Sequence, residues 1–255
     1  MKINRTAQRT VEILELIASS ESDLTLNEIA TTLRIPKTSA FDILETLVHM
    51  KMLYIKEQRL KTYSIGVKAY VIGNNYSKTS LLLNSSSSII KNVAKITGYS
   101  VLIAKEDGRK VIYTMKHEPD KKIIATPEIG DRDYLHATSA GKAILAFSQE
   151  HFDQINQSEL KRLTEWTITS TTDLKAELFD IRTQGYAVSQ RENGEHLFSI
   201  AAPIFDFNGV VSAAVELVGL YIEGDDYQME IESVKAAALE ISKRQGWHGR
   251  EDRYA

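Results

Sequence analysis

Two amphipathic helical segments joined by a very short turn constrain the fold of this chain more than any other feature. The first begins at Thr25, where Thr-Leu-Asn-Glu has the form of a capping box, and its apolar residues extend to Leu33. The second begins at Pro36, a residue that suits the first turn of a helix. Its apolar residues recur at i, i+3, i+4, i+7 and i+8, at Ala40, Ile43, Leu44, Leu47 and Val48. This spacing predicts two packed helices, the second from about Pro36 to Met50.

The outer face of the second helix carries residues that can contact a partner. When the apolar stripe is buried, Thr38, Phe41 and Asp42 remain outside, and Lys37 and Ser39 lie at the exposed start. A short helix pair with such a second helix is the arrangement that enters the DNA major groove. Lysine binds phosphate or guanine, the hydroxyls bond either, phenylalanine meets the thymine methyl and aspartate accepts from cytosine. The alternative is a three-helix module whose polar face is only solvated.

The flanking segments favour the DNA-binding alternative. Apolar periodicity predicts a first helix over residues 5–19. After the helix pair, residues 53–55 and 63–65 are typical of two short strands around a polar tip that contains Arg59 and Lys61. Cations at such a tip would contact phosphates, which set position rather than sequence choice. Three helices and a hairpin predict a winged helix-turn-helix.

Residues 9–66 resemble the winged helix-turn-helix of the IclR family of bacterial transcriptional regulators, through RTVEILELIA, LTLNEIATTLRIPKTSAFDILETL and YSIG. Three later stretches resemble signatures of the family's effector-binding domain: YLHATSAGKAILA (134–146), IRTQGYAVSQREN (181–193) and SIAAPIFDFNGVVSAAVEL (199–217). The resemblance implies a DNA-binding head, a linker helix and a GAF-like sensor domain, assembled as a homodimer or homotetramer on double-stranded operator DNA of palindromic form.

The same resemblance implies site residues. Thr25 joins Lys37, Thr38, Ser39, Phe41, Asp42, Arg59 and Lys61 as a DNA contact, and the effector set is Gly130, Ser139, Ala140, Ser189, Glu192, Ser199 and Glu216. Each effector residue could instead be a plain capping or strand residue. The chain departs from the family pattern at Asp42, where arginine is more common, and at the tip, which lacks glycine. Asp42 must read a base amine or pair with a neighbour, and we favour the pairing.

The remaining residues predict an α+β domain. Strands are expected at residues 100–105, 110–115, 186–190, 198–205 and 210–218, and helices at 137–147, 173–184 and 227–245. Asn208-Gly209 is a hairpin turn signal. The predicted organisation is a DNA-binding domain at 1–66, linker helices at 67–98 with a weak joint near Asn84, and an effector-binding and dimerisation domain at 99–255.

Glu216 interrupts the apolar strand VVSAAVELV. A buried carboxylate requires a partner. If Glu216 lines the effector pocket, it predicts an effector that is cationic or rich in hydroxyls, such as a sugar derivative, rather than a simple dicarboxylate. The alternative is a strand-end glutamate paired with a surface base.

Enzymatic and metal-binding alternatives have weaker support. Ser139, His136 and Asp131 or Asp133 could form a hydrolytic triad, but the chain has no G-x-S-x-G elbow. His136, Glu192 and His196 lack a standard metal-ligand spacing. We therefore expect neither an enzyme nor a cofactor or metal. A ligand sensor that has lost DNA binding is the third alternative.

Composition is consistent with a cytoplasmic protein. The chain has no cysteine and no stretch of the roughly 18–20 apolar residues that span a bilayer, so we expect no membrane partner. Its net charge is −3, but residues 1–66 hold nine basic and eight acidic side chains. This asymmetry has the sign expected for a DNA-binding head and is too small to decide alone.

Overall fold

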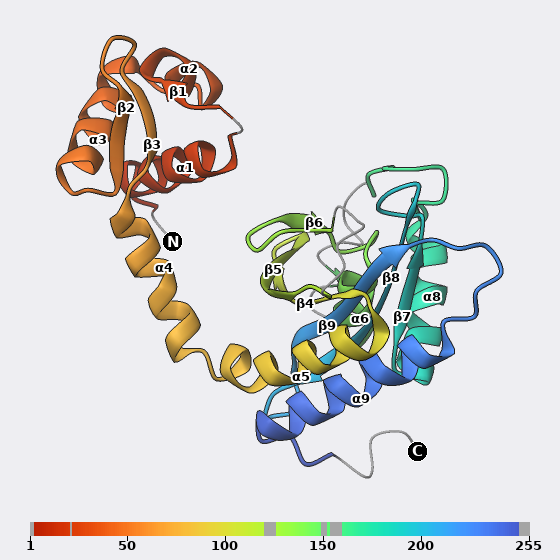
Figure 1. Cartoon of the computed structure of the whole chain (residues 1–255). Helices are drawn as coiled ribbons and strands as arrows, with labels where there is room; N and C mark the ends of the chain where they lie inside the picture. Colours follow the sequence, from red (N-terminus) through yellow and green to blue (C-terminus); the bar gives the residue numbers. More distant parts are fainter. Residues whose placement is uncertain (1–2, 21, 120–125, 149–151, 154–159, 250–255) are drawn as a thin grey trace. The chain divides into compact units, whose positions relative to one another are not determined.

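A computed structural model describes residues 3–20, 22–119, 126–148, 152–153 and 160–249 of the chain (Figure 1). Its contacts divide the chain into two units, Met1–Thr79 and Ser80–Ala255. The division falls inside the predicted linker. Each unit has its own hydrophobic core and is described by itself.

The first unit contains the predicted winged helix-turn-helix. Its elements are α1 (Arg5–Ser19), β1 (Leu24–Thr25), α2 (Leu26–Thr32), α3 (Lys37–His49), β2 (Leu53–Glu57) and β3 (Thr62–Ile65). Both halves of the predicted capping box form, since the Thr25 side chain accepts from the Glu28 amide and the Glu28 carboxylate accepts from the Thr25 amide. Helices α1, α2 and α3 bury Ile13, Ile29 and Leu44 against the hairpin.

The wing is a hairpin that gains a third strand from a distant segment. Strand β3 lies between β1 and β2, with Leu24 opposite Tyr63. A two-residue strand has no periodicity of its own, and the sequence did not predict β1. The turn that lacks glycine places Lys61 at φ 49°, a left-handed conformation that costs a non-glycine residue roughly 1–2 kcal/mol.

Two helices follow the wing, α4 (Val67–Thr79) and α5 (Leu81–Thr97). The joint predicted near Asn84 is wrong, because the break falls at Ser80 and Asn84 lies inside α5. Ser80 has an extended backbone, and its side chain accepts a hydrogen bond from the Leu83 amide at 3.4 Å. An N-cap therefore begins the second helix before the serine run.

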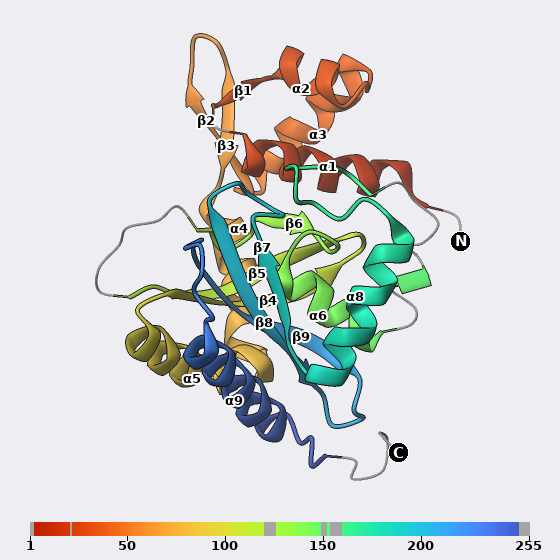
Figure 2. The same ribbon diagram turned by 90° about the vertical axis from the view of Figure 1, so that its right-hand side faces the viewer.

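The second unit is built on a six-stranded antiparallel sheet with the order β6-β5-β4-β9-β8-β7. Helices α5 and α9 lie on one face and α6 and α8 on the other (Figure 2). The strands are β4 (Ser100–Asp107), β5 (Lys110–His117), β6 (Arg132–Tyr134), β7 (Ala187–Gln190), β8 (Leu197–Phe205) and β9 (Val211–Leu220), and the helices are α6 (Ser139–Phe147), α8 (Thr171–Gln184) and α9 (Gln228–Arg244). The predicted α+β class is confirmed, and only the short β6 was not predicted.

Alternation along the strands separates two cores. On β9, Val215 and Leu217 pack with α5 and α9, whereas Ala214 and Val218 pack with α6 and α8. Glu216 shares the second face because residues two apart point the same way. The register places Glu216 opposite Ala201 of β8 and Ser199 opposite Ser189 of β7. Residues from three strands thus face the start of α6.

Candidate DNA-binding surface and effector site

The N-terminal half of α3 presents an exposed, mixed polar and aromatic face. Lys37, Thr38, Phe41 and Asp42 are all exposed, with 43% of Phe41 accessible. Ser39 is half-buried, and its Oγ accepts a hydrogen bond from Arg9 Nη1 at 3.1 Å. This bond connects α1 to the start of α3. Four of the five predicted α3 residues are therefore free to contact a partner directly.

The pairing that we favoured for Asp42 is wrong among the described residues. The Asp42 carboxylate has no ion-pair partner there within 4.0 Å, and only its backbone carbonyl is used, as acceptor for Thr46 Oγ1 at 2.7 Å. An exposed carboxylate on this face either accepts a hydrogen bond from the amino group of a base or repels the DNA phosphates.

The other predicted DNA-contact residues differ in whether their side chains are exposed or already hydrogen-bonded. Arg59 and Lys61 are exposed at the wing tip. The Thr25 hydroxyl is used in the capping box, where it lies 2.7 Å from Glu28 Oε2. Sequence reasoning missed Arg9 and Arg34, which is exposed in the turn before α3 at φ 53°. The signal for Arg34 is its position directly before the proline-led helix.

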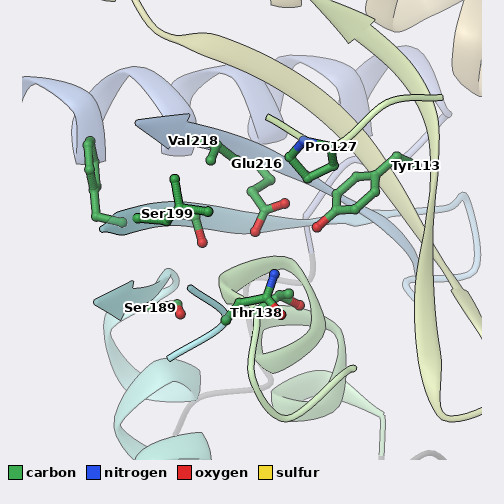
Figure 3. A pocket seen from close by; sticks show the side chains of 10 residues that line it. Tyr113, Pro127, Thr138, Ser189, Ser199, Glu216 and Val218 are labelled. Carbon is green, nitrogen blue, oxygen red and sulfur yellow. The ribbon is translucent and has the colours of Figure 1, made fainter. Parts of the chain in front are cut away.

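A small cavity lies in the second unit between the sheet and the start of α6 (Figure 3). Its volume is about 20 Å³, close to the space of one or two water molecules. Pro127 and Val218 are among its apolar walls. Its polar walls are Tyr113, Thr138, Ser189, Asn193, Ser199 and Glu216.

Glu216 is the central polar residue of this cavity, and it is 1% exposed. Its Oε1 accepts from Ser139 Oγ at 2.8 Å and from the Ala140 amide at 3.2 Å. Ser139 Oγ also lies 2.8 Å from Ser199 Oγ. Glu216 Oε2 has no hydrogen-bond partner among the described residues. The carboxyl is therefore half satisfied at the first turn of α6.

A second buried carboxyl is connected to the cavity through a tyrosine. Tyr113 Oη donates to Asp133 Oδ2 at 3.2 Å. Burial raises the pKa of Asp133, while hydrogen bonds from Asn193 and Tyr113 lower it. Burial and the nearby Glu216 and Asp133 carboxylates raise the pKa of Tyr113. The phenol therefore stays protonated between two acidic groups.

The start of α6 is capped internally. Thr138 Oγ1 accepts from the Gly141 amide at 3.0 Å. Ser189 Oγ donates to the Ala137 carbonyl at 2.9 Å, which fixes β7 to the same turn. Ser139 and Ala140 contribute a hydroxyl and an amide to Glu216 and lie behind the cavity wall.

Besides Ser139 and Ala140, two more predicted effector residues are not among those that line the cavity. Gly130, at φ 98°, donates its amide to the Tyr113 carbonyl at 2.8 Å. Glu192 is buried, and its Oε1 accepts from Lys142 Nζ at 2.6 Å. Lys142 also pairs with Glu177. Glu192 therefore belongs to an ion cluster between α6 and α8 rather than to the cavity.

The hydrolytic and metal-binding alternatives gain no geometric support in the described part of the chain. Ser139 bonds to Glu216 and Ser199, whereas His136 Nε2 lies 3.0 Å from the Lys161 carbonyl oxygen. Among the described residues, no group of three His, Asp or Glu is arranged to hold a metal.

Seven residues that line the cavity were missed by sequence reasoning: Tyr113, Pro127, Thr138, Asn193, Leu197, Phe198 and Val218. Thr138 carried a usable signal, because a threonine directly before a small-residue helix is a typical N-cap. Strand pairing across the sheet brings Tyr113, Leu197, Phe198 and Val218 to the cavity, whereas Pro127 and Asn193 reach it from loops, and nothing in the local sequence of these six residues indicates it.

Replacing Glu216 by glutamine should change how stability depends on pH. Burial raises the pKa of Glu216 above the 4.5 of an exposed glutamate, although hydrogen bonds from Ser139 and Ala140 lower it in part. The folded state therefore holds a proton that the unfolded state releases, so this contribution to stability is complete below pH 4.5 and is lost as the pH rises through the folded pKa.

We expect the wild type to lose unfolding free energy relative to Glu216→Gln as the pH rises from about 4.5. The variant has no carboxyl at this position and so does not share this loss. Urea unfolding followed by circular dichroism at half-unit pH intervals measures it. A difference that is constant with pH would contradict the raised pKa.

The described part of the chain contains no helix with the length and apolarity that a bilayer crossing requires. A winged helix-turn-helix with an exposed α3 face, followed by an α+β domain with a buried polar cavity, defines the class of ligand-responsive, DNA-binding transcriptional regulators.

The chain belongs to the IclR family of bacterial transcriptional regulators. Residues 6–54 match the IclR helix-turn-helix domain, and residues 75–243 match the bacterial transcriptional regulator IclR C-terminal domain. The chain is thus a DNA-binding transcriptional regulator with a C-terminal effector-binding domain, and this family is not one of enzymes.

Three proteins of this family are similar to the chain in sequence or in structure. The HTH-type transcriptional regulator BhcR of Paracoccus denitrificans is 29% identical over 93% of this chain and 86% of its own length. The crystal structure of Thermotoga maritima IclR is 29% identical, covers 95% of this chain and 99% of that chain, and has a TM-score of 0.73. An IclR homologue from Microbacterium hydrocarbonoxydans, complexed with 4-hydroxybenzoate, shares the fold at 19% identity, with a TM-score of 0.82 and coverage of 94% and 98%.

Proposed function

We propose that this protein binds a palindromic operator as a homodimer or a dimer of dimers and represses transcription until a small polar metabolite enters the cavity at Glu216. The single observation that supports the effector-binding part of this proposal is the Glu216 carboxyl, which lies among neutral hydroxyls and has one oxygen without a hydrogen-bond partner among the described residues. The exposed residues of α3 and the cations of the wing tip support the DNA half.

The proposed dimerisation is supported by an apolar surface on α4. Val67, Tyr70 and Val71 are 72%, 70% and 61% exposed and lie three and four residues apart. That spacing places them on one helix face. A second copy that covers this face would present two α3 helices to one operator, as palindromic half-sites require.

The proposed effector is cationic or rich in hydroxyls. Tyr113, Thr138, Ser189 and Ser199 offer hydroxyls, and Asn193 offers an amide. The bound 4-hydroxybenzoate belongs to the Microbacterium homologue, whose low identity transfers the fold alone.

Fluorescence anisotropy with the protein's own upstream intergenic DNA, a scrambled duplex and a salt series tests the proposal. We expect nanomolar, sequence-selective binding with a steep negative salt dependence. Equal micromolar binding to both duplexes, with and without candidate effectors, would favour the alternative of a sensor without effective DNA binding. The unpaired Asp42 carboxylate is the observation that keeps this alternative in place.

Replacing Lys37 by alanine should weaken operator binding and reduce its salt dependence. Lys37 is exposed at the first position of α3, where an ammonium meets a phosphate or a guanine. Loss of one phosphate contact lowers the slope of log K against log salt by about 0.9. The measurement is the same anisotropy titration at five salt concentrations.

Lys95→Ala, in the last turn of α5, is the matched control, and we expect it to keep the wild-type slope. An unchanged slope for Lys37→Ala on both duplexes would exclude a phosphate contact. A loss of selectivity at unchanged slope would instead assign Lys37 to a base.

A further inference from the structure

The cavity contains one buried polar atom that has no hydrogen-bond partner among the described residues. Glu216 Oε2 is buried, and Figure 3 shows the carboxyl projecting from β9 into the space between Tyr113, Thr138 and Ser199. A buried carboxyl oxygen without a donor is costly, so a ligand that supplies a donor to this oxygen would gain affinity from it.

The first turn of α6 cannot supply the donors that an anionic ligand needs. Free amides at a helix start are a general anion site. Here the Ala140 amide donates to Glu216 Oε1 at 3.2 Å, and the Gly141 amide donates to Thr138 Oγ1 at 3.0 Å. Ser139 Oγ also bonds to Glu216. The Glu216 carboxyl therefore occupies the place that a ligand carboxylate would take.

The charges around the cavity also oppose an anion. The described residues that line the cavity include no lysine, arginine or histidine, and their titratable groups are Glu216 and Tyr113. The next carboxyl, Asp133, accepts from Tyr113 Oη at 3.2 Å. An incoming carboxylate would face two acidic groups without a compensating cation, an arrangement that burial makes more unfavourable.

We propose that the effector of this regulator is a small primary amine, whose ammonium group enters the cavity and binds Glu216 Oε2 among the cavity's hydroxyls. This rests on the proposed function of the cavity as the effector site. An ammonium group has three donors and no acceptor, so the lone pairs of Glu216, Tyr113 and Ser199 complement it. The free volume of about 20 Å³ is suited to a group of this size.

Binding of the amine should depend on pH. Burial raises the pKa of Glu216, with Asp133 adding to the increase, so the empty site holds a larger protonated fraction at acidic pH than an exposed glutamate does. Pairing with an ammonium ion requires the carboxylate form, so the fraction that is protonated must release its proton to solvent. The affinity for the amine therefore rises with pH until it exceeds the folded pKa of Glu216. Tyr113 and Asp133 are the other titratable groups that face this carboxyl.

Matched compounds that differ only in charge test the class of effector. The probes are ethanolamine, ethylene glycol and glycolate, then glucosamine, glucose and glucuronate, followed by sets of biological primary amines and carboxylates. The melting temperature of the full-length protein is measured with each compound at 10 mM, and every hit is titrated by calorimetry. We expect amines to stabilise the wild type and matched carboxylates to have no effect.

Variants assign the effect to the carboxyl. Glu216→Gln keeps the shape and should bind the amine about ten- to a hundredfold more weakly, as expected for loss of a charge-assisted hydrogen bond. Glu232→Gln, an exposed glutamate of α9, should bind like the wild type. Circular dichroism establishes that both variants fold.

Three results would overturn the proposal: stabilisation by carboxylates but not amines, equal amine binding by Glu216→Gln, or no stabilisation by any amine. Operator binding measured with the same compounds separates this failure from that of the proposed function. A carboxylate that binds and alters operator affinity would retain the effector-controlled regulator and reject only the amine.

Discussion

Replacing Gly141 by alanine is expected to destabilise the C-terminal unit by about 3 kcal/mol, the upper range for overpacking. Gly141 lies in the first turn of α6, and an added Cβ would overlap the backbone carbonyl and Cα of Leu135. Backbone atoms cannot move aside as a side chain can. The strain would also displace Thr138 and Ser139 at the start of the helix, so effector binding should be lost with stability.

The control for this prediction is Gly73→Ala in α4. An added Cβ there meets no atom within 4 Å, and alanine in a helix interior is favoured over glycine by roughly 0.5–1 kcal/mol. Urea unfolding followed by circular dichroism compares the two variants with the wild type. Equal stability of Gly141→Ala and the wild type would show that α6 does not approach the Leu135 backbone closely.

Replacing Lys142 by methionine is expected to cost about 3–5 kcal/mol of unfolding free energy. Lys142 is fully buried, with Nζ 2.6 Å from Glu192 Oε1 and paired also with Glu177 of α8. Burial raises the pKa of Glu192, and the Lys142 ammonium partly offsets that increase. Methionine has a similar volume but leaves the Glu192 carboxylate buried without a cation.

Lys235→Met is the matched substitution at an exposed ion pair. Lys235 lies 3.2 Å from Glu232, and the side chains are 38% and 59% exposed, so the loss should be at most about 1 kcal/mol. The triple variant Lys142→Met, Glu177→Gln, Glu192→Gln removes all three charges and should recover much of the loss. If Lys142→Met costs no more than Lys235→Met in urea unfolding, the cluster contributes little.

The DNA-binding head was predictable because its determinants are local. The range predicted for the first helix agrees with α1, and the capping box at Thr25 and Glu28 forms as expected. Helical spacing and caps act within a few residues of the chain. The joint of the linker was misplaced because a serine run resembled a break, whereas a single capping serine, Ser80, ends one helix and begins the next.

The effector site was predictable only in part. Glu216 was correctly singled out, since a charge within an apolar strand is visible in the sequence. Its partners are not, because Ser139 is 77 residues away and the connection depends on how α6 packs on the sheet. The same reason explains why Glu192 was placed in the cavity, when its partner Lys142 lies 50 residues before it.

The sequence by itself determined the order of the helices and of the longer strands, the amphipathic faces and the family resemblance, since each follows from residue types at short spacing. The tertiary structure decided which polar groups meet. Strand register brings Glu216, Ser199 and Tyr113 to one face, and helix packing satisfies one oxygen of Glu216 while leaving the other open. Hydrogen bonds and charges act over a few ångströms in space, and only the folded chain defines those distances.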